Sequence, residues 1–112
     1  DDIILLKVGR HIRPNKRFKM IISREEGENN FLEGYRKQFI HLRTVSHTGP
    51  LVLIEGEPTE DDLQLAAQIT ARFSSGRSAE QVNVETHRLD GTTLHSNVVP
   101  LHPDQIPQAW YV

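Results

Sequence analysis

The sequence is defined first by what it lacks. It contains no cysteine among its 112 residues, which excludes disulfide bonds, thiolate metal sites and cysteine nucleophiles. No apolar run approaches the roughly 18 residues of a membrane span, so we expect no membrane partner. Absent cysteine fits a cytoplasmic location, which is our expectation, and the length fits a single domain spanning residues 1–112.

The motifs of common catalytic sites are also missing. The chain has no GxxxxGK[ST] phosphate loop and no SGGxDS-type loop. Its six histidines are scattered, and no two have metal-binding spacing on a credible helix. Serine, histidine and aspartate occur, but no pattern brings them together. We therefore predict no catalytic residue, no metal site and no cofactor.

Positive charge, by contrast, is concentrated in residues 7–24. The whole chain carries −2, whereas this stretch has seven cations and no acid, which leaves −9 for the remainder. A solvated strand edge, where cations discourage aggregation, explains two or three such charges more easily than seven. Segregated positive charge predicts an anionic partner, and we favour nucleic acid bound through its phosphates. The stretch contains Lys7, Arg10, His11, Arg13, Lys16, Arg17, Lys19 and Arg24.

A β-hairpin is predicted for this stretch, with strands over 3–13 and 17–23. If the loop is residues 14–16, Arg13 lies opposite Arg17 and His11 opposite Lys19. These side chains and Lys7 would then share one face, with Phe18, Met20 and Ile22 turned to the core. Like charges directly opposite one another destabilise a sheet, so an anion would relieve them.

The rest of the chain predicts an α+β fold of order ββα-ββα-ββ. We expect a mixed or antiparallel sheet with two helices packed mainly on one face. Residues 38–45 and the continuous apolar run 51–54 are predicted strands, and Asp90-Gly91 is typical of a hairpin turn between strands 81–87 and 92–101. The tail, residues 102–112, is expected to dock through its aromatic side chains.

Two acidic clusters are interpreted as helix starts rather than as catalytic or metal-binding carboxylates. Ser23 and Glu26 fit a capping box before a helix over about 24–35. Thr59 caps a longer helix whose first turn is Glu60-Asp61-Asp62, and that helix ends at Ser74-Ser75-Gly76.

Several short motifs resemble one family of domains. Gly9-Arg10-His11 with Arg13, then Arg24, then Glu28-Asn29, is similar to the RNA-binding domain of NFACT proteins, in the variant at the C-terminus of PP-loop ATPases related to tRNA thiouridylases. Gly49-Pro50 and Gly76-Arg77 also fit. Ser23 departs from the pattern, because the family tends to have glycine there. The resemblance covers residues 5–77 better than the last 35.

The resemblance implies a non-catalytic module from the C-terminal part of a longer protein. Its partners would be RNA, most reasonably tRNA, and a catalytic PP-loop domain of the same chain. Arg77 joins the basic stretch as an RNA-binding residue, at the margin with His11. Two other hypotheses stay open: an interaction or dimerisation module docking through Ile106, Trp110, Tyr111 and Val112, and an enzyme domain for a phosphorylated small molecule using Arg10, His11 and Arg24.

Overall fold

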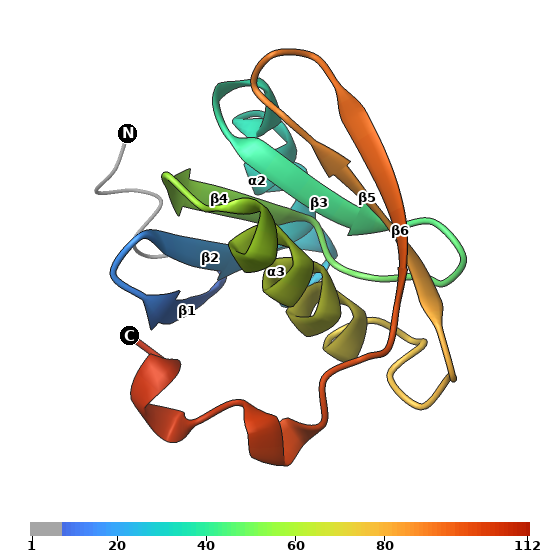
Figure 1. Cartoon of the computed structure of the whole chain (residues 1–112). Coiled ribbons are helices and arrows are strands. Elements are labelled where there is room, and N and C mark those ends of the chain that lie inside the picture. The colour runs from blue at the N-terminus through green and yellow to red at the C-terminus, as the bar shows by residue number, and fades with distance from the viewer. Residues whose placement is uncertain (1–7) are drawn as a thin grey trace.

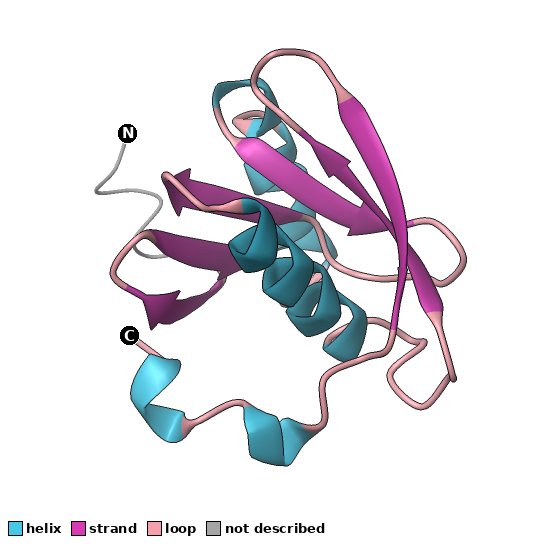
Figure 2. Cartoon of the chain, in the orientation of Figure 1, coloured by secondary structure: helices cyan, strands magenta, loops and turns pink. Residues whose placement is uncertain are grey.

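The computed structural model describes residues 8–112 and contains a six-stranded antiparallel sheet (Figures 1 and 2). The strand order is β1-β2-β4-β3-β5-β6, and every neighbouring pair is antiparallel. This confirms the predicted α+β class and element order. The strands are β1 (Arg10–Asn15), β2 (Phe18–Ile22), β3 (Ile40–Thr44), β4 (Val52–Gly56), β5 (Val82–His87) and β6 (Thr93–Val98); the α-helices are α2 (Glu26–Glu33) and α3 (Glu60–Arg72).

The two helices lie on opposite faces of the sheet, so the prediction of one shared face is wrong. Helix α3 packs on Met20, Ile22 and Val52 in the main core. Leu32 of α2 packs on Ile21 and Leu53, whose side chains point to the other face. The physical reason is in β2 and β4, where consecutive apolar residues are buried because both faces are covered.

The β1–β2 hairpin has a different register from the predicted one. His11 lies opposite Ile21 rather than Lys19, and the pairing shifts between Ile12 and Asn15. Because of this irregularity, Arg13 and Arg17 do not lie opposite each other in the strand pairing. Residues 3–7 of the predicted strand over 3–13, with the cation Lys7, lie outside the described residues.

Helix α2 begins later than predicted and lacks the expected cap. Its N-cap residue is Glu25, which makes no side-chain capping bond. The Ser23 hydroxyl accepts instead from the backbone N–H of Leu51, at 3.1 Å. A short 3₁₀ helix, η1 (Arg36–Gln38), then connects α2 to β3.

Helix α3 begins as predicted. Thr59 is its N-cap, with a reciprocal capping box in which the Asp62 backbone N–H donates to the Thr59 hydroxyl at 3.1 Å. The Asp62 carboxylate accepts in turn from the Thr59 N–H at 2.9 Å. The acidic first turn of α3 therefore serves the helix start, as the sequence indicated.

The tail crosses back to the free side of β1 through two 3₁₀ helices, η2 (Pro103–Gln105) and η3 (Gln108–Trp110) (Figure 1). Ile106 is buried in the main core, and Trp110 packs against it. Tyr111 bridges to Ile12, and the N–H of Val112 donates to the His11 carbonyl at 3.2 Å. Ile106 and Trp110 of the tail thus pack within their own chain, whereas the Val112 side chain is exposed.

Candidate nucleic-acid interface

The fold separates the basic stretch into two groups at opposite ends of the β1–β2 hairpin. Arg13, Lys16 and Arg17 lie around the hairpin turn, beside the start of α3. Arg10 and Arg24 lie at the other end, near the start of α2 and the end of α3. Since a strand rises about 3.3 Å per residue, Arg10 and Arg13 on β1 are roughly 10 Å apart, whereas Arg17 and Arg24, which flank β2, are roughly 20 Å apart.

Two cations near the hairpin turn form ion pairs with carboxylates of the same chain. Arg17 donates to Asp62 through Nε at 2.6 Å and through Nη2 at 2.7 Å. Lys19 is buried, and its Nζ lies 3.2 Å from Glu55. The Arg17 bond holds the pKa of Asp62 far below its usual range, against the opposing effect of burial. Acidic side chains of the same chain therefore relieve these charges, and the described part of the hairpin has no exposed basic face, since His11 and Lys19 are buried.

The Gly-Arg-His motif occupies the other end. Gly9 has a φ of +81°, and a Cβ there would lie 2.9 Å from the Ile22 carbonyl oxygen, so only glycine fits. The Arg10 guanidinium lies 4.6 Å from the centre of the Phe73 ring, a cation–π contact with the end of α3. His11 is buried, with Nε2 at 3.0 Å from the Val8 carbonyl oxygen.

The Glu28 side chain connects Gly9, before β1, to Arg24, after β2. Its carboxylate accepts from the backbone N–H of Gly9 at 3.0 Å and of Arg24 at 2.8 Å. It also receives the Arg24 guanidinium, with Nη2 to Oε2 at 2.6 Å. The Arg24 hydrogen bond is the largest cause of a pKa lowered to about 2. Glu28 is therefore ionised at neutral pH and holds β1, the end of β2 and α2 together.

Asn29 makes the matching connection to the sheet. Its side-chain oxygen accepts from the N–H of Leu51 at 3.0 Å, just after Gly49-Pro50. A Cβ on Gly49 would lie 2.5 Å from the Thr44 hydroxyl, so the loop packs too closely for a larger residue. The same loop binds the end of α3, because the N–H of Ser75 donates to the Thr48 carbonyl at 2.7 Å.

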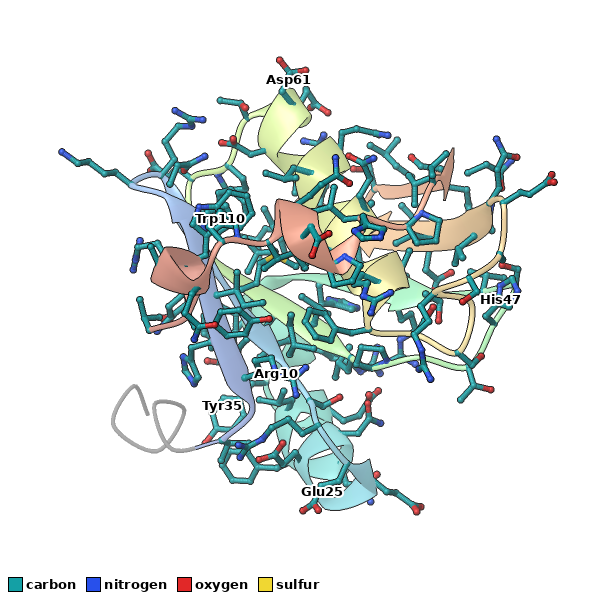
Figure 3. All side chains as sticks on the ribbon, turned by 90° about the horizontal axis from the view of Figure 1, so that it is seen from below. Arg10, Glu25, Tyr35, His47, Asp61 and Trp110 are labelled. Atoms are coloured by element: carbon teal, nitrogen blue, oxygen red, sulfur yellow. The ribbon has the colours of Figure 1, made fainter. Side chains whose placement is uncertain are left out.

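These segments border an open cleft of about 410 Å³. Figure 3 shows Arg10 between the tail and α2, with Glu25 at the start of α2 and His47 in the loop before β4. The cleft is lined by Ser23, Arg24, Glu25, Glu26, Asn29, Thr48, Gly49, Pro50 and Phe73. Motifs far apart in the sequence thus converge on one concave surface, which combines a guanidinium with an aromatic ring and backbone groups.

Comparison with known proteins identifies the family. The family model described as the NFACT protein RNA binding domain matches residues 9–111. The chain belongs to this family. RNA, the partner class that the resemblance implied, is thereby supported, and it agrees with the nucleic acid predicted from the basic stretch. An RNA-binding domain is also consistent with a non-catalytic module. No curated protein matches the chain.

A solved structure shares the fold of this NFACT-type domain. The C-terminal part of the fibronectin/fibrinogen-binding protein from Streptococcus suis superposes with a TM-score of 0.76 at 16% sequence identity. The match covers 94% of this chain and 49% of that one. The chain therefore spans about half the length of its structural relative.

The nine predicted contact residues have different surroundings in the domain. Arg13, Lys16 and Arg77 are exposed, and none has a carboxylate partner among the described residues. Arg10 and Arg24 are held by Phe73 and Glu28 but keep part of their surface open. His11 and Lys19 are buried, Arg17 is bound to Asp62, and Lys7 lies outside residues 8–112.

Sequence reasoning missed the roles of three residues at the cleft. Glu28 and Asn29 were recognised only as family motif residues, whereas the structure makes them the connections that shape the site. Phe73 belongs to no motif in the sequence, although its ring contacts the Arg10 guanidinium. No local pattern indicates that contact, because it joins β1 to the end of α3.

None of the helices described is long and apolar enough to cross a membrane.

Proposed function

We propose that this domain binds structured RNA, specifically tRNA, through the backbone phosphates at the motif cleft. The observation that carries the proposal is the convergence of the family motifs on one cleft, which Arg24 lines and beside which Arg10 contacts the lining residue Phe73. Arg24 keeps 51% of its side chain exposed although Glu28 fixes it in place. A guanidinium oriented before binding loses less side-chain entropy when it contacts a phosphate.

The geometry indicates how the two arginines act. Arg24 uses Nε and Nη2 for Glu28, so Nη1 remains to donate to a phosphate oxygen. Arg10 lies over the Phe73 ring, a contact that uses none of its N–H donors, so these can serve the same purpose. Arg77 follows Gly76 in the loop bound to Thr48 and adds a third cation. Arg13 and Lys16 at the hairpin turn serve as outlying contacts with a large, folded RNA.

The parent protein is proposed to be a PP-loop ATPase related to tRNA thiouridylases, acting in the cytoplasm. The motifs at Gly9–His11 and Glu28-Asn29 support this assignment through their resemblance to that variant of the family. In such a protein the domain would hold the RNA while the PP-loop domain performs ATP-dependent chemistry. The domain itself would contribute binding energy and no catalytic group.

The decisive experiment is a salt titration of the domain with bulk tRNA, beside a single-stranded RNA of equal length. We expect tighter binding to tRNA, with an affinity that falls steeply as salt rises. The double variant Arg10→Ala/Arg77→Ala should lower the salt slope by about two phosphate contacts. Arg13→Ala/Lys16→Ala, with the same change in charge, should have a smaller effect because these residues lie far from the cleft. Equal effects of the two pairs would contradict a site centred on the cleft, and absence of binding at low salt would contradict RNA as the partner.

A second candidate, protein binding, is favoured by one observation. Strand β6 is an edge of the sheet, and Leu94 and Val99 on or beside it are 45% and 58% exposed. Such an edge can pair with a strand of another protein. Sedimentation at several concentrations tests self-association directly: a monomer at all concentrations, unchanged by Leu94→Lys, would exclude dimerisation through this edge.

A further inference from the structure

A second pocket, of about 230 Å³, lies at the far end of α2 from the cleft. It is bordered by η1, the start of β3 and the turn between β5 and β6, which lie at the same end of the molecule in Figure 1. No carboxylate is among the nine residues that line it. Its basic and histidine side chains are Arg36, Lys37, His41, His87 and Arg88.

Two histidines form one wall of this pocket. His41 on β3 lies directly opposite His87 on β5, and their rings are stacked, with centroids 4.4 Å apart and planes 6° from parallel. His41 is buried, and its burial lowers the pKa of the ring. A bound anion would offset that effect, because it favours the charged form of both rings.

The charged groups around the histidine pair are mainly cationic. Among the described residues, Glu85 is the one carboxylate hydrogen-bonded to the pair, with Oε1 at 2.9 Å from Nε2 of His87. Asp90 lies in the adjoining turn, where it accepts from Thr92. The cations come from η1, β3 and the end of β5, and His95 lies opposite Glu85 on β6. They are Arg36, Lys37, Arg43 and Arg88.

These cations are available to a ligand in different degrees. Arg36 and Arg43 share one carboxylate, Glu33, at 2.8 and 2.7 Å. Arg88 pairs with Glu60, whose side chain is 74% exposed. Lys37 is exposed and has no partner among residues 8–112. Exposed ion pairs of this kind are weak, so a phosphate can replace a carboxylate at little cost.

We propose that this pocket is a second phosphate site, which takes a backbone phosphate of the bound RNA. Lys37 and Arg36 would contact the phosphate oxygens, with the His41–His87 pair beneath them. The identity of the ligand rests on the proposed RNA-binding function. Helix α2, about 12 Å long for its eight residues, separates the pocket from the cleft, so an RNA backbone lying along it reaches both.

A salt titration with tRNA tests the contact. Lys37→Gln should lower the salt slope by about one phosphate contact and weaken binding about threefold to tenfold at moderate salt. Gln108→Glu in the exposed η3 is the matched control, because it changes the net charge by the same amount far from the pocket. Equal effects of the two variants would overturn the proposal and indicate a general influence of net charge.

The imidazole resonances of the histidines give a second, independent measurement. On addition of tRNA, we expect the His41 and His87 signals to shift, while His102, exposed in the tail, stays unchanged. Inorganic phosphate serves as a separate probe. Shifts with phosphate but not with tRNA would overturn the assignment to RNA, and shifts with neither would overturn the site. Loss of tRNA binding in Arg10→Ala/Arg77→Ala is measured separately. A wrong proposal for the pocket can therefore be distinguished from a wrong proposal for the cleft.

Discussion

At the scale of single residues, the domain uses its charged side chains for two purposes that the sequence does not separate. Arg17, Lys19 and Arg24 look alike as members of a basic stretch, yet each is bound to a carboxylate of the same chain. Arg13 and Lys16, from the same stretch, remain exposed without such a partner in the described structure. Charge concentration in a sequence therefore indicates the partner class, whereas only the fold identifies which cations are available.

Glu28 provides a pH-dependent test of the cleft. Because its folded pKa is about 2 and its ordinary value about 4.5, its contribution to stability is present above pH 4.5 and is lost as the pH falls toward 2. Glu28→Gln should lower the free energy of unfolding by about 1–3 kcal/mol at pH 7. In urea denaturation the difference from the native chain should shrink between pH 4.5 and 2.

The control for that experiment is Glu26→Gln, which removes an exposed carboxylate from the same turn of α2. Its effect should stay within about 0.5 kcal/mol at every pH. A constant Glu28→Gln difference across the acid range would show that the carboxylate is not stabilised by its ionised contacts.

Asp62 gives a corresponding test at the start of α3. Asp62→Ala removes the capping bond from Thr59 and leaves Arg17 and Asn15 without their acceptor. We expect a loss of about 2–4 kcal/mol in thermal or urea unfolding. Asp61→Ala, one residue earlier and exposed, should cost less than about 1 kcal/mol, since it affects only the helix dipole. Similar losses in both variants would contradict a specific role for Asp62.

At the scale of elements, the sequence predicted most of the architecture but not the placement of α2. The helix over 59–73 and the β5–β6 hairpin follow from helical spacing, a cap and a turn motif, all of which are local. The predicted register of the β1–β2 hairpin is wrong, because it places Pro14 in the turn, whereas Pro14 lies within strand β1 at the irregularity between Ile12 and Asn15, where its missing N–H cannot join the ladder. The Ser23–Glu26 capping pattern failed because the Ser23 hydroxyl and Asn29 both bind Leu51, a contact across 22 or more residues.

The glycines of two elements should respond oppositely to substitution. Gly27 lies in the first turn of α2 with only Glu25 Oε1 nearby, at 3.5 Å, so Gly27→Ala should stabilise the domain by about 0.5–1 kcal/mol. A Cβ on Gly76 would lie 2.7 Å from the His47 ring, so Gly76→Ala should destabilise it by about 1–3 kcal/mol. Melting temperatures of the two variants measure both effects, and a shift in the same direction would contradict the packing described here.

At the scale of the whole molecule, the sheet is covered by a helix on each face and by the tail along β1. The two covered faces explain why Val52, Leu53 and Ile54 are buried at consecutive positions of β4, a run that predicted a strand but not a helix on each face. The candidate cleft lies where α2, the loop before β4 and the end of α3 meet. Each of these three segments carries a short sequence motif, but nothing in the sequence indicates that the three motifs lie together in the fold.

Removal of the tail, residues 102–112, tests its contribution to the whole domain. The deletion exposes the part of the core that Ile106 and Trp110 cover and removes the bond from Val112 to His11. We expect the free energy of unfolding to fall by about 2–4 kcal/mol. Sedimentation of the intact chain should show no dependence on concentration. A deletion without loss of stability would mean that the tail adds little to this fold.

The bond between Val112 and His11 has a consequence for protein engineering. Because it brings the last residue next to His11, three residues from Val8, a linker of a few glycines would join residues 112 and 8 without distorting the fold. New ends placed at Asp90-Gly91, an exposed turn with open space around it, would give a circular permutant with the same contacts. In that permutant β6 and the tail would be synthesised first and β5, the one strand that pairs with β6, last, so the hairpin that is local in the native chain would form only after synthesis is complete.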